Sequence, residues 1–142
     1  MKLGRREPAL GGQSIDLVVQ VAVELDQTLA LYRELLDKLD AGASLEAQRE
    51  RILRHARDGA AVGRLQVVSF DALHDGVPDW LAPDMALGLL RVLRYGLVAL
   101  AQDPPDLDAL VSRAELEARV AGADIEDWLV WCLERASEQG WR

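Results

Sequence analysis

Residues 83–102 read PDMALGLLRVLRYGLVALAQ and contain the most apolar stretch of the chain. Placed on a helix, their apolar side chains cover nearly the whole circumference, and only Asp84, Gly88, Arg91 and Arg94 form a narrow polar strip. A helix of this kind is typical of the centre of a core, whereas the two arginines argue against a membrane span. We therefore predict a central core helix over residues 83–102.

Gly88 and Gly96 stand eight residues apart on one side of this helix. In mid-helix each glycine costs about 0.5–1 kcal/mol relative to alanine, because it gives up more backbone freedom on folding. We expect the close approach of a neighbouring helix to offset this cost.

Helical periodicity and capping residues predict further helices on both sides of the central one. Ser44 and Asp124 are suitable N-cap residues, and Ser112 and Glu115 have the spacing of a capping box. Gly42 can end the first helix in a left-handed conformation. The predicted helices cover residues 14–39, 44–57, 112–120 and 124–137.

The remaining segments set the limits of the fold. Residues 1–13 lack apolar periodicity and are predicted to form a flexible arm, so that residues 14–142 make up a single helical domain. Residues 65–70 fit a short strand or a helix, and we favour the helix because no second strand is available for pairing. The predicted fold class is all-α, an irregular bundle of five to six helices with a helix-turn-helix-like corner in its C-terminal third.

The composition is typical of a soluble globular protein, with 142 residues of which 50% are hydrophobic and 28% charged. Sixteen basic and 24 acidic residues give a net charge of −8, which argues against nucleic acid and anionic membranes as partners. The single Cys132 cannot form an intrachain disulfide, and the two histidines have no metal-binding spacing, so neither a metal nor another cofactor is expected. These features, with no predicted secretory or membrane-spanning segment, favour a cytoplasmic protein, and the composition suggests a bacterial one.

Arg49 and His55 form an enzyme-like pattern. An arginine, five intervening residues and a histidine on a predicted helix are similar to the Arg-x(4–6)-His signature of the HEPN family, all-helical domains that include ribonucleases. The resemblance implies that this pair would bind and activate the scissile phosphate of RNA. Glu50 follows the arginine here, where the family usually has Asn, Asp or His. The alternative, which we favour, is that both residues belong to a solvated charged face and that the chain is not an enzyme.

Residues 112–142 hold a second pattern. Ala118 and Gly122 stand four apart, as the small residue and the turn glycine do in helix-turn-helix units, so a winged-helix-type DNA-binding regulator is a further alternative. The exposed side of its second helix would carry acidic residues such as Glu126 and Glu134, which repel phosphates. A helical corner used for packing is therefore preferred.

The third pattern is a high share of tryptophan among the aromatic residues. The chain has four tryptophans but only one phenylalanine and two tyrosines. Tryptophan is enriched at binding hot spots as well as in cores. Apolar side chains also wrap most of two helices, which is more surface than a chain of this length buries easily. We therefore predict a non-enzymatic helical protein–protein interaction module, which binds a protein partner or associates with itself as a homo-oligomer, adaptor or small subunit. The expected contact residues are Leu17, Val21, Tyr32, Trp80, Trp128, Trp131 and Trp141.

Overall fold

The computed structural model describes residues 12–58, 83–122 and 124–138, and the side chains of residues 12–17 and 56–58 lie outside the described part. The described chain is all-helical, which confirms the predicted fold class. Its elements, in chain order, are α1 (Gly12–Asp40), the short 3-10 helix η2 (Glu46–Gln48), α2 (Arg49–Asp58), α5 (Asp84–Leu100), a second 3-10 helix η4 (Leu107–Ala109), α6 (Arg113–Gly122) and α7 (Ile125–Glu138).

The ends of these helices differ from the predicted ends by a few residues. α1 begins at Gly12, so it includes the last two residues of the predicted arm. The second predicted helix begins only at Arg49, because residues 46–48 first form the tighter 3-10 turn that often precedes an α-helix. The rest of the predicted arm, residues 1–11, and the choice between strand and helix at residues 65–70 lie outside the described residues.

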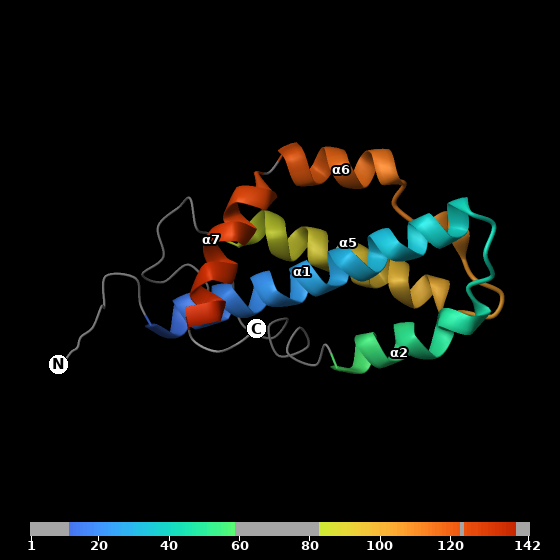
Figure 1. Ribbon diagram of the computed structural model, residues 1–142, viewed down its shortest axis with the longest axis horizontal. Coiled ribbons are helices and arrows are strands. Elements are labelled where there is room, and N and C mark those ends of the chain that lie inside the picture. The colour runs from blue at the N-terminus through green and yellow to red at the C-terminus, as the bar shows by residue number, and fades with distance from the viewer. Residues whose placement is uncertain (1–11, 59–82, 123, 139–142) are drawn as a thin grey trace.

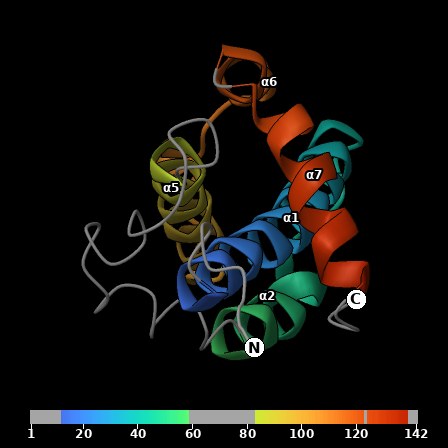
Figure 2. The ribbon, with the colours of Figure 1, turned by 90° about the vertical axis from the view of Figure 1, so that its left-hand side faces the viewer.

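α1 is the axis of the bundle and runs the length of the described fold (Figure 1). α5 and α7 pack on opposite sides of it, as the end-on view of Figure 2 shows. α2 packs on α5 and runs antiparallel to it, and α6 packs on α7. α1 thus has α5 on one side and α7 on the other, which accounts for the apolar residues around most of the first half of its sequence.

The core lies where α1, α5 and α7 meet. α5 lies in the core as predicted, but it is buried on one face and not around nearly its whole circumference. The buried residues of this face are Ala86, Leu87, Leu89, Leu90, Leu93, Gly96, Leu97, Ala99 and Leu100. α7 contributes Trp128, Leu129 and Cys132 from one side of its helix. A fully buried leucine contributes about 1.5–3 kcal/mol relative to an exposed one, so this shared core is the main source of stability.

Tyr32 of α1 fixes the contact with α5. Its side chain is 1% exposed, and its hydroxyl donates a hydrogen bond to the Val111 carbonyl at 3.1 Å and accepts one from the Val111 N–H at 2.8 Å. Its ring lies on Gly96, where an added Cβ would be 3.1 Å from Cε2 and 3.2 Å from the hydroxyl oxygen. The close approach expected at a glycine of α5 is therefore confirmed at Gly96.

Gly88 differs from Gly96. A Cβ added to Gly88 would meet no heavy atom within 4 Å in the described part of the chain, and the residue is exposed. The expected close approach is therefore not made within the described fold at this second glycine, and nothing there offsets its cost to the helix.

Local capping agrees with the sequence at two helix ends. Gly42 follows α1 with a φ of 75°, the left-handed conformation predicted for it. Ser44 Oγ accepts the Glu46 N–H at 3.2 Å, but the N-cap of the 3-10 turn is Leu45, which has no side-chain cap, so the cap predicted at Ser44 is not formed. Ser112 Oγ accepts the Glu115 N–H at 3.2 Å and caps α6 as predicted. These caps end or begin the helices at the places where the chain must turn.

We predict that Tyr32→Phe lowers the free energy of unfolding by about 1–3 kcal/mol, because the buried N–H and C=O of Val111 both lose their partner. Tyr95→Phe is the matched control, since the Tyr95 side chain is exposed and its loss of a hydroxyl should change stability by less than about 0.5 kcal/mol. Urea denaturation followed by circular dichroism measures both. Equal losses in the two variants would contradict this role of Tyr32.

Candidate functional site

The residues expected to contact a partner are found in different environments. Val21 and Tyr32 are buried, and the contacts described for them are within this chain. Trp128 also packs in the core, whereas Trp131 is partly exposed. The side chain of Leu17, and Trp80 and Trp141 as a whole, lie outside the described residues. Of the described members of this set, only Trp131 reaches the surface to a substantial extent.

Trp131 packs against the core from α7 and is partly exposed, next to the acidic outer side of that helix. The guanidinium of Arg135 stacks over its ring, with its carbon 4.7 Å from the ring centroid, and pairs with Glu138 at 2.8 Å. The exposed residues of this helix include Glu126, Asp127, Val130 and Glu134. The described outer side of α7 is therefore mainly acidic, an unfavourable surface for the phosphates of a DNA major groove.

Arg49 and His55 project from different sides of α2. Six residues along an α-helix correspond to a rotation of about 120° between side chains. Arg49 reaches the end of α5, where it donates to the Gln102 carbonyl at 3.3 Å and pairs with Asp103 at 3.5 Å. His55 faces α1, where its Nε2 lies 3.0 Å from the Thr28 hydroxyl. The helix thus turns the two residues of the ribonuclease-like pattern towards different neighbours.

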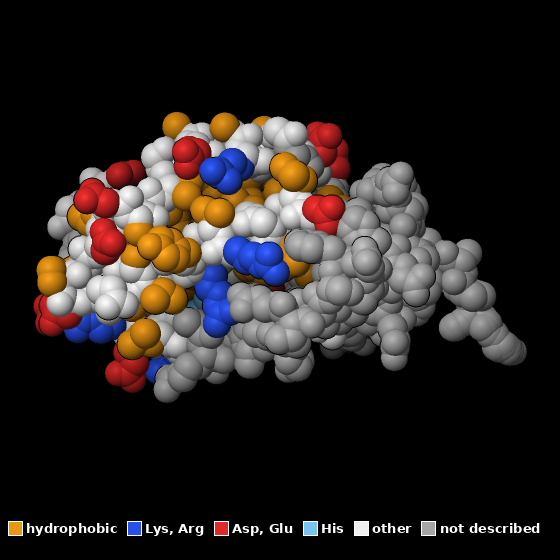
Figure 3. All heavy atoms as spheres, turned by 180° about the vertical axis from the view of Figure 1, so that it is seen from behind, with side chains coloured by type: hydrophobic (Ala, Val, Ile, Leu, Met, Phe, Trp, Pro, Cys, Tyr) orange, Lys and Arg blue, Asp and Glu red, His pale blue; other side chains and the backbone are white. Residues whose placement is uncertain are grey.

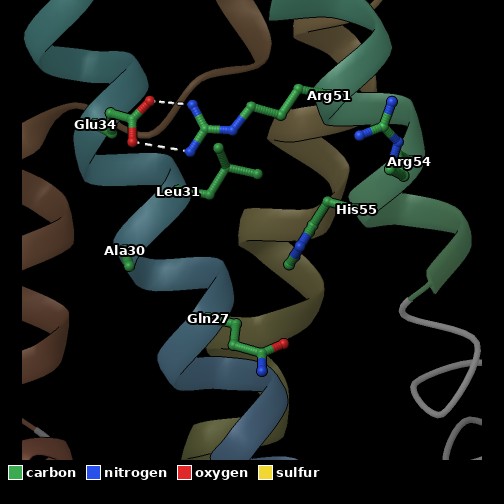
Figure 4. A pocket seen from close by; sticks show the side chains of 7 residues that line it. All are labelled: Gln27, Ala30, Leu31, Glu34, Arg51, Arg54 and His55. Carbon is green, nitrogen blue, oxygen red and sulfur yellow. Dashed lines mark hydrogen bonds and ion pairs between the residues drawn. The ribbon is translucent and has the colours of Figure 1, made fainter.

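A pocket of about 440 Å³ lies between α1 and α2, and His55 is at its wall (Figure 4). Its lining residues are Gln27, Ala30, Leu31, Glu34, Arg51, Arg54 and His55. Arg49 belongs instead to a smaller hollow of about 180 Å³, where it lies with Leu100, Asp103 and the two prolines that follow. The buried Nε of Arg49 is the one buried side-chain polar atom without a hydrogen-bond partner in the described part of the chain.

The polar groups of the α1–α2 pocket are largely paired with one another. Arg51 donates to both carboxylate oxygens of Glu34, and its NH2 lies 2.9 Å from Oε1 (Figure 4). Hydrogen bonding to the guanidinium lowers the pKa of Glu34 below its ordinary value of 4.5 and raises the pKa of Arg51. Thr28 is the one polar residue buried in the described part of the chain, and His55 bonds to it. These contacts hold α2 against α1, which is a structural role.

A second set of ion pairs connects α1 to α6. Arg33 donates two hydrogen bonds to Glu117, at 3.0 Å from Nε and 2.6 Å from NH2. Arg113 pairs with Asp37 and also donates to the Arg33 carbonyl at 3.3 Å. The hydrogen bonds from Arg33 lower the pKa of Glu117 below 4.5 and raise that of Arg33. These charged residues are thus engaged in holding α6 on the bundle.

Metal and thiol chemistry find little support in the described residues. They contain no group of three or more His, Cys, Asp and Glu side chains placed to hold a metal ion. Cys132 is fully buried, and burial raises the pKa of its thiol to about 12. The thiol is therefore protonated near neutral pH and shielded from reagents.

The outer face of α5 is the most apolar exposed surface on any one described helix. Tyr95 is 68% exposed, Met85 66% and Val98 42%. Figure 3 views the molecule from the side on which α5 lies, and it shows hydrophobic side chains in orange with basic side chains in blue among them. The sequence singled out Asp84, Arg91 and the two glycines on this helix, but it did not predict that three large apolar residues would face outward.

Within the described residues, no helix combines the length and the apolar character needed to cross a membrane. Comparison of the chain with protein-family models, with curated proteins and with solved structures finds no significant match. The function of this chain must therefore be inferred from its own residues.

We predict that His55→Ala lowers the free energy of unfolding by about 1–2 kcal/mol, because the buried Thr28 hydroxyl loses its hydrogen bond. Arg54→Ala, on the same pocket but exposed and with an ion pair at 3.9 Å as its described contact, should change stability by less than about 0.5 kcal/mol. Neither variant nor the parent protein should cleave RNA above a protein-free control. Cleavage by the parent that disappears in His55→Ala would contradict the structural role of this residue.

The free energy of unfolding should also fall in acid. In the folded chain the pKa values of Glu34 and Glu117 lie below 4.5, and the fall should occur between about pH 4.5 and these values. Both carboxyls bind protons more weakly in the folded chain, so their contribution is present above pH 4.5 and is lost as the pH drops. Arg33→Gln should flatten this part of the profile because it removes the partner of Glu117. Arg119→Gln, which removes a pair within α6 at 3.9 Å, is the control, and an equal effect would contradict the prediction.

Proposed function

We propose that this protein is a helical interaction module that binds another polypeptide through the outer face of α5. The observation that supports the proposal is the exposure of Met85, Tyr95 and Val98 on a helix whose opposite face forms the core. Exposed apolar residues are ordinary when scattered singly, but α5 carries three of the six large ones that are exposed in the described part of the chain, and a concentration of this kind favours an interaction site. α5 is also held firmly by its buried side, so it offers a preformed surface.

The chemistry of the described pockets supports the same proposal. In the larger pocket the Arg51 and Glu34 charges neutralise each other, and His55 is bonded to Thr28. An acid–base or nucleophilic site needs a reactive group that converges with others on a space for substrate. The pairs in this pocket stabilise the packing of two helices, so a binding role accounts for the structure better than catalysis does.

The proposed contact surface on α5 differs from the surface that the sequence predicted. The sequence favoured the first helix and the tryptophans of the last one, but Val21, Tyr32 and Trp128 serve the core. Their burial removes them from the surface and leaves α5 as the described helix with the largest exposed apolar side chains. Trp131, stacked under Arg135, is a secondary candidate at the edge of α7.

The test is affinity purification from cells that produce the protein naturally, with three forms of the chain as bait. Met85→Glu combined with Tyr95→Glu places charges on the patch, and Val130→Glu places one charge on the exposed side of α7 as a control. We expect at least one protein, this chain included, to be retained by the wild type and the control and lost from the α5 variant. The same set of proteins on all three baits would contradict a role for α5 in binding.

A further inference from the structure

We infer that the pocket between α1 and α2 binds a small organic monoanion, a carboxylate that carries a short apolar group. This site shares no lining residue with α5, so it goes beyond the proposed function. Its volume of about 440 Å³ is within the range of pockets that hold small molecules. Apolar side chains from α1 and hydrogen-bond donors from both helices line it, which is the combination that such pockets use.

The pocket carries a local excess of positive charge on an acidic chain. Apart from His55, its ionisable residues are Glu34, Arg51 and Arg54, and Arg51 is neutralised by Glu34. The positive charge of Arg54 therefore remains, whereas the chain as a whole has a net charge of −8. A small anion is repelled by most of the surface and attracted at this pocket. A monoanion balances the remaining charge, but a phosphate dianion would exceed it beside the Glu34 carboxylate.

Arg54 supplies this charge at little cost to the fold. Its side chain is 62% exposed, and its described ion pair joins it at 3.9 Å to Glu50, an 85% exposed residue one turn earlier in α2. An exposed pair of this kind contributes little to stability, so the guanidinium can exchange Glu50 for another carboxylate. A guanidinium also presents two N–H groups that match the two oxygens of a carboxylate. Arg54 is therefore the anchor that we assign to the ligand.

Gln27 supplies a second donor from the opposite wall of the pocket. Figure 4 shows its side chain directed from α1 toward the space that His55 faces from α2. Within the described residues the Gln27 amide has no hydrogen-bond partner, so its NH2 group can donate to a ligand oxygen. The ligand does not need to displace the bonds between Arg51 and Glu34 or between His55 and Thr28.

Apolar surface lies beside these donors. Leu31 is buried and Ala30 is exposed, and both line the pocket from α1. The small side chain of Ala30 leaves open a space that a larger residue would fill. A short alkyl chain or a single ring on these two residues is removed from water when the carboxylate binds, which favours an organic anion over an inorganic one.

The first experiment is a titration of the isotope-labelled full chain with hexanoate, from micromolar to about 10 millimolar, followed by nuclear magnetic resonance. The side-chain NH2 signals of Gln27 should shift and saturate. Arg54→Gln should weaken binding by at least about fivefold, because the charge and the paired donors are lost. Arg119→Gln is the matched control, since Arg119 is also exposed and pairs at 3.9 Å with a residue one turn earlier in its own helix. It should leave the affinity unchanged.

A comparison of probes tests the class of ligand. Hexanol has the apolar chain without the charge, and inorganic phosphate has the charge without the chain, so both should bind at least about fivefold more weakly than hexanoate. Ala30→Phe should abolish hexanoate binding because the added ring fills the pocket. Ala118→Phe places the same ring at an exposed position on α6 and should leave binding unchanged. Circular dichroism checks that both variants remain helical.

Several outcomes would overturn the inference. No shift with hexanoate at any concentration would do so, as would equal losses of affinity in Arg54→Gln and Arg119→Gln. Hexanol that binds as tightly as hexanoate would leave no role for the charge of the pocket, and phosphate that binds more tightly would assign a different class of ligand. None of these variants alters α5, so the polypeptide partner proposed for that helix is tested separately by the bait experiment.

Discussion

The contact between Tyr32 and Gly96 is the constraint on which the rest of the fold depends. A single missing Cβ lets the tyrosine ring lie against the α5 backbone, and the tyrosine hydroxyl then satisfies both polar groups of Val111. One side chain of α1 thus fixes α5 on one side and the segment that leads into α6 on the other. The large leucines around it fill the remaining volume, but their packing does not specify a position as narrowly as two hydrogen bonds and a steric contact do.

The ionisable residues of the described chain are used mainly to hold helices together. Glu34 with Arg51, and His55 with Thr28, join α2 to α1, while Arg33 with Glu117 joins α6 to α1. Each pair is partly exposed and contributes modestly, but together they orient three helices around one axis. This use of charge explains why a sequence with an arginine and a histidine at catalytic-like spacing forms, in the described fold, two separate structural contacts.

The two sides of α5 have different surroundings in the described fold. Its inner side is the centre of the core, and its outer side exposes three of the larger apolar residues of the chain. The rigidity that the core gives to this helix lowers the cost of binding, because little conformational freedom remains to be lost at the contact. A surface of this kind suits recognition of another polypeptide better than it suits capture of a small molecule, for which concave sites are typical.

The sequence by itself determined the all-α class, the approximate helix ends, the capping by Ser112 and the left-handed Gly42. These follow from periodicity and from contacts within a few residues, which are properties that local sequence carries. It also predicted a close neighbour at both glycines of α5, and within the described fold this holds at Gly96 and not at Gly88. Only the tertiary structure decided that the neighbour is Tyr32, that this residue bonds to Val111 at a separation of 79 positions, and that Met85 and Tyr95 face outward. The physical reason is that an apolar helix has no preferred side until other helices occupy one, and the partners that occupy it come from distant parts of the chain.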